Sequence, residues 1–152
     1  MDTFEPCWLK LQQGDFELFE YYAAKIFPYY QHVTAISLAP AGIVSAVYPA
    51  SGAQNLLGHN IFDDPQQQHD AVRIMQSKLV QLTGPYRLVQ GGTGIIGRVP
   101  VYITNDRVEG FWGFVNITFH LEKMTSLAQL QQLPTRGIHY ALLKQDAATE
   151  EQ

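Results

Sequence analysis

The sequence has one cysteine, Cys7, and only 16% charged residues. A single thiol excludes an internal disulfide, a pair of redox cysteines and a zinc cage built from several cysteines. Ten basic residues are scattered along the chain and are outnumbered by fourteen acidic ones, which gives a net charge of −4. We therefore expect no nucleic-acid or anionic-membrane surface, because both require clustered positive charge.

The sequence also lacks a long uninterrupted hydrophobic run. The stretch from Ile26 to Phe62 contains no charged residue, but prolines and glycines interrupt it too often for a membrane-spanning helix. Asp2 and Glu5 precede any apolar segment, so the N-terminus does not have the basic start and hydrophobic block of a secretory signal. We expect membrane attachment only through flanking segments that are absent from this chain.

What is present indicates a single domain spanning residues 1–152. The chain is 46% hydrophobic and 12% aromatic, which is sufficient for one self-supporting core. Helical spacing predicts a long amphipathic helix within residues 12–31, which Pro28 is expected to end. Its predicted apolar face consists of Phe16, Phe19, Ala23 and Ile26.

Alternating patterns predict five strands in an α+β arrangement. Residues 34–38 and 43–48 should form a hairpin around a type I turn at residues 39–42. A helix should begin near Asp64-Pro65 and bury a stripe of Val72, Met75 and Leu79. Strands within residues 79–89, 95–103 and 110–120 should complete an antiparallel sheet, with a helix at residues 126–133 and a partial strand at 138–143 before the polar tail.

One motif matches a nucleotide-binding fingerprint literally. Residues 92–97 read Gly-Thr-Gly-Ile-Ile-Gly, which in dinucleotide-binding proteins precedes a helix. The following residues have strand composition and include Pro100, so we interpret the glycines as a hairpin turn. A dinucleotide-dependent enzyme remains an alternative only if this segment caps a helix.

No other pattern supports catalysis or a cofactor. The five histidines have no metal-ligand spacing, and no nucleophilic triad or phosphate loop is recognisable. Asn116-Ile117-Thr118 matches an N-glycosylation acceptor, which we interpret as coincidence because it lies inside an aromatic strand. That strand alternates Trp112, Phe114 and Asn116 with Phe111, Gly113, Val115 and Ile117, so both faces of the sheet should be covered.

Six short motifs between Val33 and about Leu121 together resemble the CHASE sensor domain in order and spacing. They are Leu38-Ala39-Pro40-x-Gly42, Tyr48-Pro49-x-x-Gly52, Gly58-x-Asn60, Leu82-Thr83-Gly84-Pro85, Gly91-Gly92-x-Gly94-x-x-Gly97-Arg98-x-Pro100-Val101 and Phe111-Trp112-Gly113-Phe114-Val115. This resemblance implies a PAS-like core over residues 33–121, with the helical insertion after the second strand. Beyond this core, the residue composition assigns 122–152 to a C-terminal helix, a partial strand and a tail.

The resemblance and the strand pattern together supply candidate ligand-binding residues. In cytokinin-binding plant members of the family, an aspartate and backbone groups of a Leu-Thr element hold the ligand, and the matching positions here are Asn60 and Leu82. Asn60 replaces the usual carboxylate with an amide, which both donates and accepts hydrogen bonds. Strand residues near the expected cavity add the candidates Tyr48, Tyr86, Arg98 and Tyr102.

The resulting hypothesis is a non-catalytic sensor domain that binds an unidentified small molecule between the sheet and the middle helices. The resemblance implies an extracytoplasmic (periplasmic) domain of an inner-membrane protein, coupled to a diguanylate cyclase, phosphodiesterase or histidine kinase. A homodimer through Phe16, Phe19 or Tyr22 of the N-terminal helix is expected. The alternative is a protein-interaction module with a filled core and no small ligand.

Overall fold

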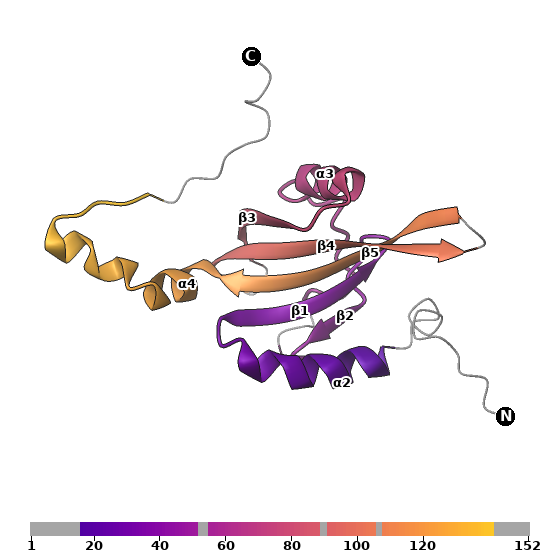
Figure 1. The fold of residues 1–152 in the computed structure, drawn as a ribbon, viewed down its shortest axis with the longest axis horizontal. Coiled ribbons are helices and arrows are strands. Elements are labelled where there is room, and N and C mark those ends of the chain that lie inside the picture. Colours follow the sequence, from indigo (N-terminus) through magenta and orange to yellow (C-terminus); the bar gives the residue numbers. More distant parts are fainter. Residues whose placement is uncertain (1–15, 52–54, 89–90, 106–107, 142–152) are drawn as a thin grey trace, which may run out of the picture.

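An antiparallel five-stranded sheet of order β2-β1-β5-β4-β3 forms the centre of the computed structural model (Figure 1). The structure describes residues 16–51, 55–88, 91–105 and 108–141. The strands are β1 (Val33–Pro40), β2 (Ala46–Tyr48), β3 (Gln81–Arg87), β4 (Thr93–Asn105) and β5 (Val108–His120). The predicted α+β, PAS-like fold is confirmed.

The sheet order brings the first long strand next to the last one. Strands β3, β4 and β5 follow one another as antiparallel neighbours, whereas β1 pairs with β5 from Val33 opposite Phe119 to Pro40 opposite Gly113. The side chains on one face of the sheet therefore come from both halves of the chain. This arrangement creates the platform on which the site is built.

Helix α2 (Glu17–Ile26) lies along the β1–β2 side of the sheet, and a 3-10 turn, η1 (Phe27–Tyr29), follows it (Figure 1). The α-helix ends just before Pro28, as predicted, and the predicted start at residue 12 lies outside the described residues. Ala23 is buried, but Ile26 is exposed, contrary to the prediction. Phe27 takes its place, because residues four apart share a helix face and the Phe27 ring contacts Tyr48 edge-on.

The β1–β2 hairpin is confirmed, but its turn differs from the predicted type I turn. Ala41 and Gly42 both have positive φ, 50° and 84°, and the Ile43 amide donates to the carbonyl of Pro40 over 2.9 Å. Two central residues of positive φ are typical of a type I′ turn, whose twist matches that of the paired strands. The turn is therefore centred one residue later than predicted.

Helix α3 (Gln68–Ser77) lies next to β3 and β4, at the other end of the sheet from α2 (Figure 1). Its residues Ala71 and Ile74 pack in the core with Phe114 of β5. Asp64 lies at the entry to this segment, where its Oδ1 accepts the Gln66 amide over 2.9 Å, although the regular helix begins at Gln68. Val72 and Leu79 of the predicted buried stripe are exposed. The buried face is instead formed by Asp70, Ala71 and Ile74, because the Asp70 carboxylate turns inward to Tyr86.

The C-terminal elements begin earlier than predicted. Helix α4 (Leu121–Leu127) follows β5 directly, and the 3-10 turns η2 (Leu130–Gln132) and η3 (Pro134–Arg136) come next. Gln129 has a positive φ of 52°, which interrupts the helix predicted for residues 126–133. Residues 138–141 of the predicted strand are irregular, and the remainder lies outside the described residues.

The glycine-rich fingerprint does not precede a helix. The Leu88 amide donates to the carbonyl of Gly92 over 3.0 Å in the turn between β3 and β4, which confirms the predicted turn at this point. Gly94 and Gly97 lie within β4, so they do not belong to the turn. The alternative of a dinucleotide-dependent enzyme, which required a helix at this point, is therefore wrong.

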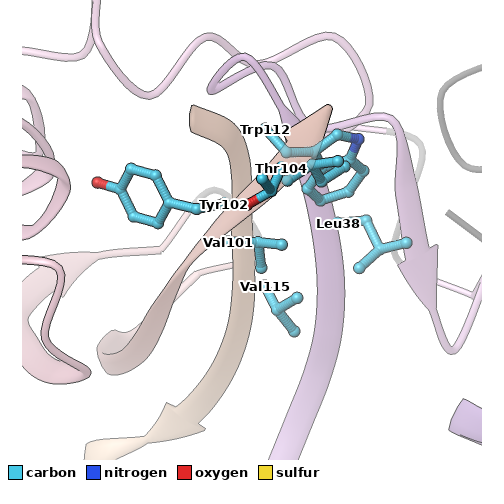
Figure 2. Close-up of a pocket in the computed structure, with 7 residues that line it drawn as sticks. Leu38, Val101, Tyr102, Thr104, Trp112 and Val115 are labelled. Atoms are coloured by element: carbon cyan, nitrogen blue, oxygen red, sulfur yellow. The ribbon is translucent and has the colours of Figure 1, made fainter. Parts of the chain in front are cut away.

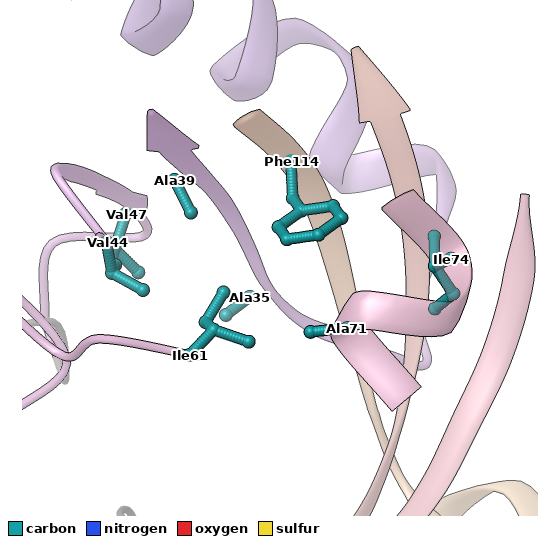
Figure 3. Packing of buried hydrophobic residues seen from close by; sticks show 8 residues of the cluster. All are labelled: Ala35, Ala39, Val44, Val47, Ile61, Ala71, Ile74 and Phe114. Atoms are coloured by element: carbon teal, nitrogen blue, oxygen red, sulfur yellow. The ribbon is translucent and has the colours of Figure 1, made fainter. Parts of the chain in front are cut away.

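The hydrophobic core lies between the sheet and the segment that contains α3 (Figure 3). It consists of Ala35, Ala39, Val44, Val47, Ile61, Ala71, Ile74 and Phe114. The predicted alternation in β5 fails near its start, because Trp112 is an extra residue between the pairs Val101–Gly113 and Tyr102–Phe111. This β-bulge turns Phe111 to the same side as Phe114, where the two rings lie 5.0 Å apart.

Candidate functional site

Two adjoining cavities lie between the sheet and the segment from Leu56 to Gln67. One has a volume of about 50 Å³ and contains Arg98 and Asn116 in its wall. The second has a volume of about 100 Å³ and contains Asp64 and Tyr86. The two share Leu56, His59, Gln67, Ile96 and Thr118.

Arg98 is the buried charged group of the smaller cavity, with 1% of its surface exposed. Its Nε donates to Oδ1 of Asn116 over 2.9 Å, and its Nη2 donates to Oε1 of Gln67 over 2.6 Å. Its Nη1 is buried without a hydrogen-bond partner. The guanidinium is thus fixed on two sides and unsatisfied on the third.

The position of Arg98 follows from the register of the sheet. Ser37 of β1, Asn116 of β5 and Arg98 of β4 are direct cross-strand neighbours, so their side chains project to the same face. Asn116 Nδ2 donates to Ser37 Oγ over 3.3 Å, which extends the polar row across three strands. Asn116 is 4% exposed, so the asparagine of the N-glycosylation triplet lies inside the fold.

The middle segment supplies the opposite wall. Gln67 Nε2 donates to Oδ2 of Asp64 over 2.7 Å, while Nε2 of His59 lies 3.1 Å from the same oxygen. Gln67 therefore spans from the Asp64 carboxylate to the Arg98 guanidinium through the two ends of one amide. This amide connects the middle segment to the floor of the sheet.

A second buried polar pair borders the site. The Tyr86 hydroxyl donates to Asp70, whose other oxygen accepts from Arg73 Nη2 over 2.9 Å. Burial raises the pKa of Tyr86 well above its ordinary value of 10.0, and the hydrogen bond to Asp70 raises it further. Burial lowers the pKa of Arg98, an effect that Tyr86, Asp70 and Asp64 oppose electrostatically.

The structure brings two of the six predicted site residues to these cavities, Tyr86 and Arg98. Asn60 is used in a local turn, where its Oδ1 accepts the Phe62 amide over 3.1 Å and its Nδ2 donates to Asp63 over 2.7 Å. The Tyr102 hydroxyl donates to the carbonyl of Met75, at the far end of α3. Asn60 and Tyr102 do not line either cavity.

Strand alternation explains the positions of the remaining two candidates. Tyr48 pairs with Ile36, the neighbour of Ser37, and therefore faces the α2 side of the sheet. Leu82 pairs with Gly97, the neighbour of Arg98, and is 67% exposed on that same opposite side. Neither side chain lines the Arg98 cavity.

Sequence reasoning missed the acceptors that hold Arg98. In the sequence, Gln67 lies close to the predicted helix start at Asp64-Pro65, and Asn116 belongs to the N-glycosylation triplet and to a strand face. One signal was available. The alternation of β5 places Asn116 on the same face as Phe114, and Arg98 has only two faces on which it can lie, so a contact between Arg98 and Asn116 could have been considered. Nothing in the local sequence indicates that Gln67 contacts a strand 31 residues later.

A different groove, of about 400 Å³, lies on the other face of the sheet (Figure 2). Leu38, Val101, Val115 and Trp112 gather there, whereas the Tyr102 ring points away from them (Figure 2). No charged side chain lines this groove among the described residues. It therefore lacks a charged group to orient a polar ligand, unlike the cavity at Arg98.

The described residues contain no cluster of three or more His, Cys, Asp or Glu side chains suited to a metal ion. In the same part of the chain, no helix has the length and apolar character needed to cross a membrane. The site-bearing part of the domain is thus a PAS-like sheet with small polar cavities between the sheet and the segment that precedes α3.

Comparison with known proteins assigns the family. The CHASE domain model matches residues 12–152, and the chain belongs to this family. CHASE domains are extracellular, sensory and non-catalytic, which confirms the resemblance seen in the sequence and the expectation that this domain is not an enzyme.

A solved structure shares the fold. An extracellular ligand binding receptor from Desulfohalobium retbaense DSM5692 matches with a TM-score of 0.58 and 19% sequence identity, over 74% of this chain. The chain corresponds to 20% of the length of that receptor chain. The search of curated proteins found no match.

Proposed function

We propose that this sensor domain binds a small molecule between the sheet and the middle segment, at the cavity beside Arg98. The observation that carries this proposal is the buried Nη1 of Arg98, which has no partner although a cavity adjoins the residue. A buried donor without a hydrogen bond costs about 1–3 kcal/mol, and more when the group is charged. A ligand acceptor at this position would remove that cost.

Ligand binding would act on the chain through Gln67. This residue holds Arg98 with its Oε1 and directly precedes α3. A ligand that competes for the guanidinium, or that adds to the contact, changes how firmly the start of α3 is attached to β4. A signal arises only if two arrangements of this segment bind the ligand with different affinity.

In the intact protein the domain would lie on the periplasmic side of an inner membrane and control a diguanylate cyclase, phosphodiesterase or histidine kinase output. The CHASE assignment supports the extracellular position and the sensory role. The inner-membrane attachment and the kind of output are part of the proposal.

Helix α2 would pair with the same helix of a second copy. Leu18, Tyr22 and Ile26 are spaced four residues apart and are all exposed, so they form one apolar stripe on the helix. Of the residues expected to dimerise, Phe16 and Phe19 are half-buried within the domain, whereas Tyr22 lies in this exposed stripe. We therefore assign the dimer contact to the stripe of Leu18, Tyr22 and Ile26.

The test is mass spectrometry of material released from the purified domain, combined with a thermal-shift screen of purines, amino acids and carboxylates. A true cavity ligand should lose its effect in Ala35→Val, because Ala35 lines the cavity and valine suits a strand. Ala24→Val on the exposed side of α2 is the control and should bind as the wild type does. No bound or stabilising compound across the screen would contradict a ligand-binding role.

The alternative function is an interaction module without a small ligand. The close packing around Phe114 and the small volume of the cavity, about 50 Å³, favour it. Under this reading, Ala35→Val should leave signalling by the full-length protein intact, whereas charge in the α2 stripe should abolish it. The opposite pattern would reject this alternative.

A further inference from the structure

The hydrogen bonds of Arg98 leave one of its three nitrogens, Nη1, buried without a partner. The guanidinium has five N–H donors, and the contacts to Asn116 and Gln67 use Nε and Nη2. Nη1 carries two further donors and has no partner, although the residue is 99% enclosed. The acceptors on the other two nitrogens are neutral, so neither hydrogen bond pairs the guanidinium with a negative charge.

The neighbouring carboxylates are already engaged with other groups. The ion pairs found in the described part of the chain are His59–Asp64, Arg73–Asp70 and Lys78–Glu109, and none of them includes Arg98. Asp64 also accepts from Gln67 and Asp70 from Tyr86. The two carboxylates influence Arg98 electrostatically.

The cavity beside Arg98 combines this cation with an apolar wall. Its volume, about 50 Å³, exceeds the roughly 10–15 Å³ that one water requires. Besides Arg98, five polar residues line the cavity: Ser37, His59, Gln67, Asn116 and Thr118. The rest of the wall is largely aliphatic and is formed by Ala35, Val44, Leu56, Ile61 and Ile96.

From this combination we propose that the cavity binds a small aliphatic monocarboxylate, with a carboxylate oxygen accepting from Nη1 of Arg98 and the alkyl part against the aliphatic wall. This inference rests on the proposed ligand-binding function of the cavity and specifies its chemical class. A neutral ligand would leave the buried charge unpaired. A dianion such as phosphate would carry a second negative charge toward Asp64 and Asp70.

Propionate is the probe, and its matched control is propionamide, which has the same shape without the charge. We expect propionate at about one hundred times its Kd to raise the Tm of the domain by about 5 °C or more. Propionamide and sodium chloride at equal ionic strength should leave the Tm unchanged. Titration calorimetry with acetate, propionate and butyrate then determines the preferred chain length.

Substitutions locate the effect. In Arg98→Met the propionate shift should be lost, whereas Arg136→Met, the same change at an exposed arginine of η3, should retain it. If Arg98→Met does not fold, Ala35→Val decides the question with the arginine intact, because the filled cavity should lose the propionate shift. A full propionate shift in Ala35→Val would overturn the assignment to this cavity.

The outcomes separate the ligand class from the ligand site. Two results would overturn the monocarboxylate class while supporting the cavity as a binding site. The first is an equal shift with propionamide that is lost in Ala35→Val, and the second is an Arg98-dependent shift that phosphate produces and propionate does not. The same conclusion would follow if no carboxylate shifts the Tm, while a purine or another neutral compound raises it and this rise is lost in Ala35→Val. Failure of every compound in the broad screen would overturn both proposals.

Discussion

Arg98 on β4 and Asn116 on β5 are direct partners in the sheet, and their side chains are joined by a hydrogen bond of 2.9 Å. The same Asn116 amide reaches Ser37 on β1, so a polar row crosses the centre of an otherwise apolar face. Buried polar side chains in such a position depend on hydrogen bonds to one another, because leaving a buried polar group without a partner lowers the stability of the fold.

Replacing the acceptor of Arg98 should destabilise the fold. We expect Asn116→Ala to lower the free energy of unfolding by about 2–3 kcal/mol, because a buried charged donor then loses its partner. Urea denaturation in carboxylate-free buffer measures the change. The exposed Asn55→Ala variant should stay within about 0.5 kcal/mol of the wild type, and an equal loss in both variants would contradict a special role for Asn116.

Tyr86 should make the stability depend on alkaline pH. Its pKa is raised in the folded state, so above about pH 10 the unfolded chain releases this proton while the folded chain keeps it. The unfolded state then binds fewer protons, and stability falls as the pH rises. Urea midpoints at pH 8 and 10.5 should therefore fall less in Tyr86→Phe than in the wild type. Identical pH dependence in the two proteins would contradict the buried Tyr86–Asp70 contact.

Gly113 should not tolerate a side chain. Its φ is +154°, and a Cβ there would collide with the backbone carbonyl of Ala39 on the neighbouring strand. We expect Gly113→Ala to cost about 2–3 kcal/mol or more, measured by thermal and urea unfolding. Gly58→Ala is the control, because Gly58 also has positive φ but has open space around it, and its cost should be about 1 kcal/mol. Equal losses would exclude the steric explanation.

Charge in the exposed stripe of α2 should abolish self-association. Tyr22→Glu places a carboxylate in the centre of the stripe that includes Leu18 and Ile26, so sedimentation should show a dimer for the wild type and a monomer for the variant. His139→Glu adds a charge at an exposed position far along the chain and should leave the dimer intact. A monomeric wild type at high concentration would remove the helix-pairing proposal.

Most of the sheet could be predicted because the pattern that identifies a strand lies within the strand's own residues. Alternating side chains identified the long strands, and the composition after residue 97 correctly excluded a helix at the glycine motif. The turn at Ala41 and Gly42 was misplaced by one residue, because Pro40 is compatible with either a turn or a strand end. The bulge at Trp112 could not be anticipated, since it depends on the pairing of β4 with β5.

The site was harder to predict because its parts meet only after folding. Arg98 and Tyr86 were identified from their chemistry and their strands, but a period-two pattern does not say which face is covered. That ambiguity placed Tyr48 among the candidates although its side chain points to the other face of the sheet. Leu82 was a candidate through the family resemblance, and its side chain also points to that other face. The buried face of α3 is mispredicted for a related reason, since Asp70 is a polar residue whose contacts with Tyr86 and Arg73 form only after folding.

The pairing of Val33 with Phe119 means that the chain enters and leaves the sheet at neighbouring points. The end of the α2–η1 segment and the start of α4 are therefore fastened to adjacent strands. Sliding β1 along β5 by one residue would shift the two flanks by about 3.3 Å, but it would also turn every side chain of β1 to the wrong face. A tilt or twist of the whole strand pair, in contrast, would move the flanks while the hydrogen-bond ladder between β1 and β5 stays intact.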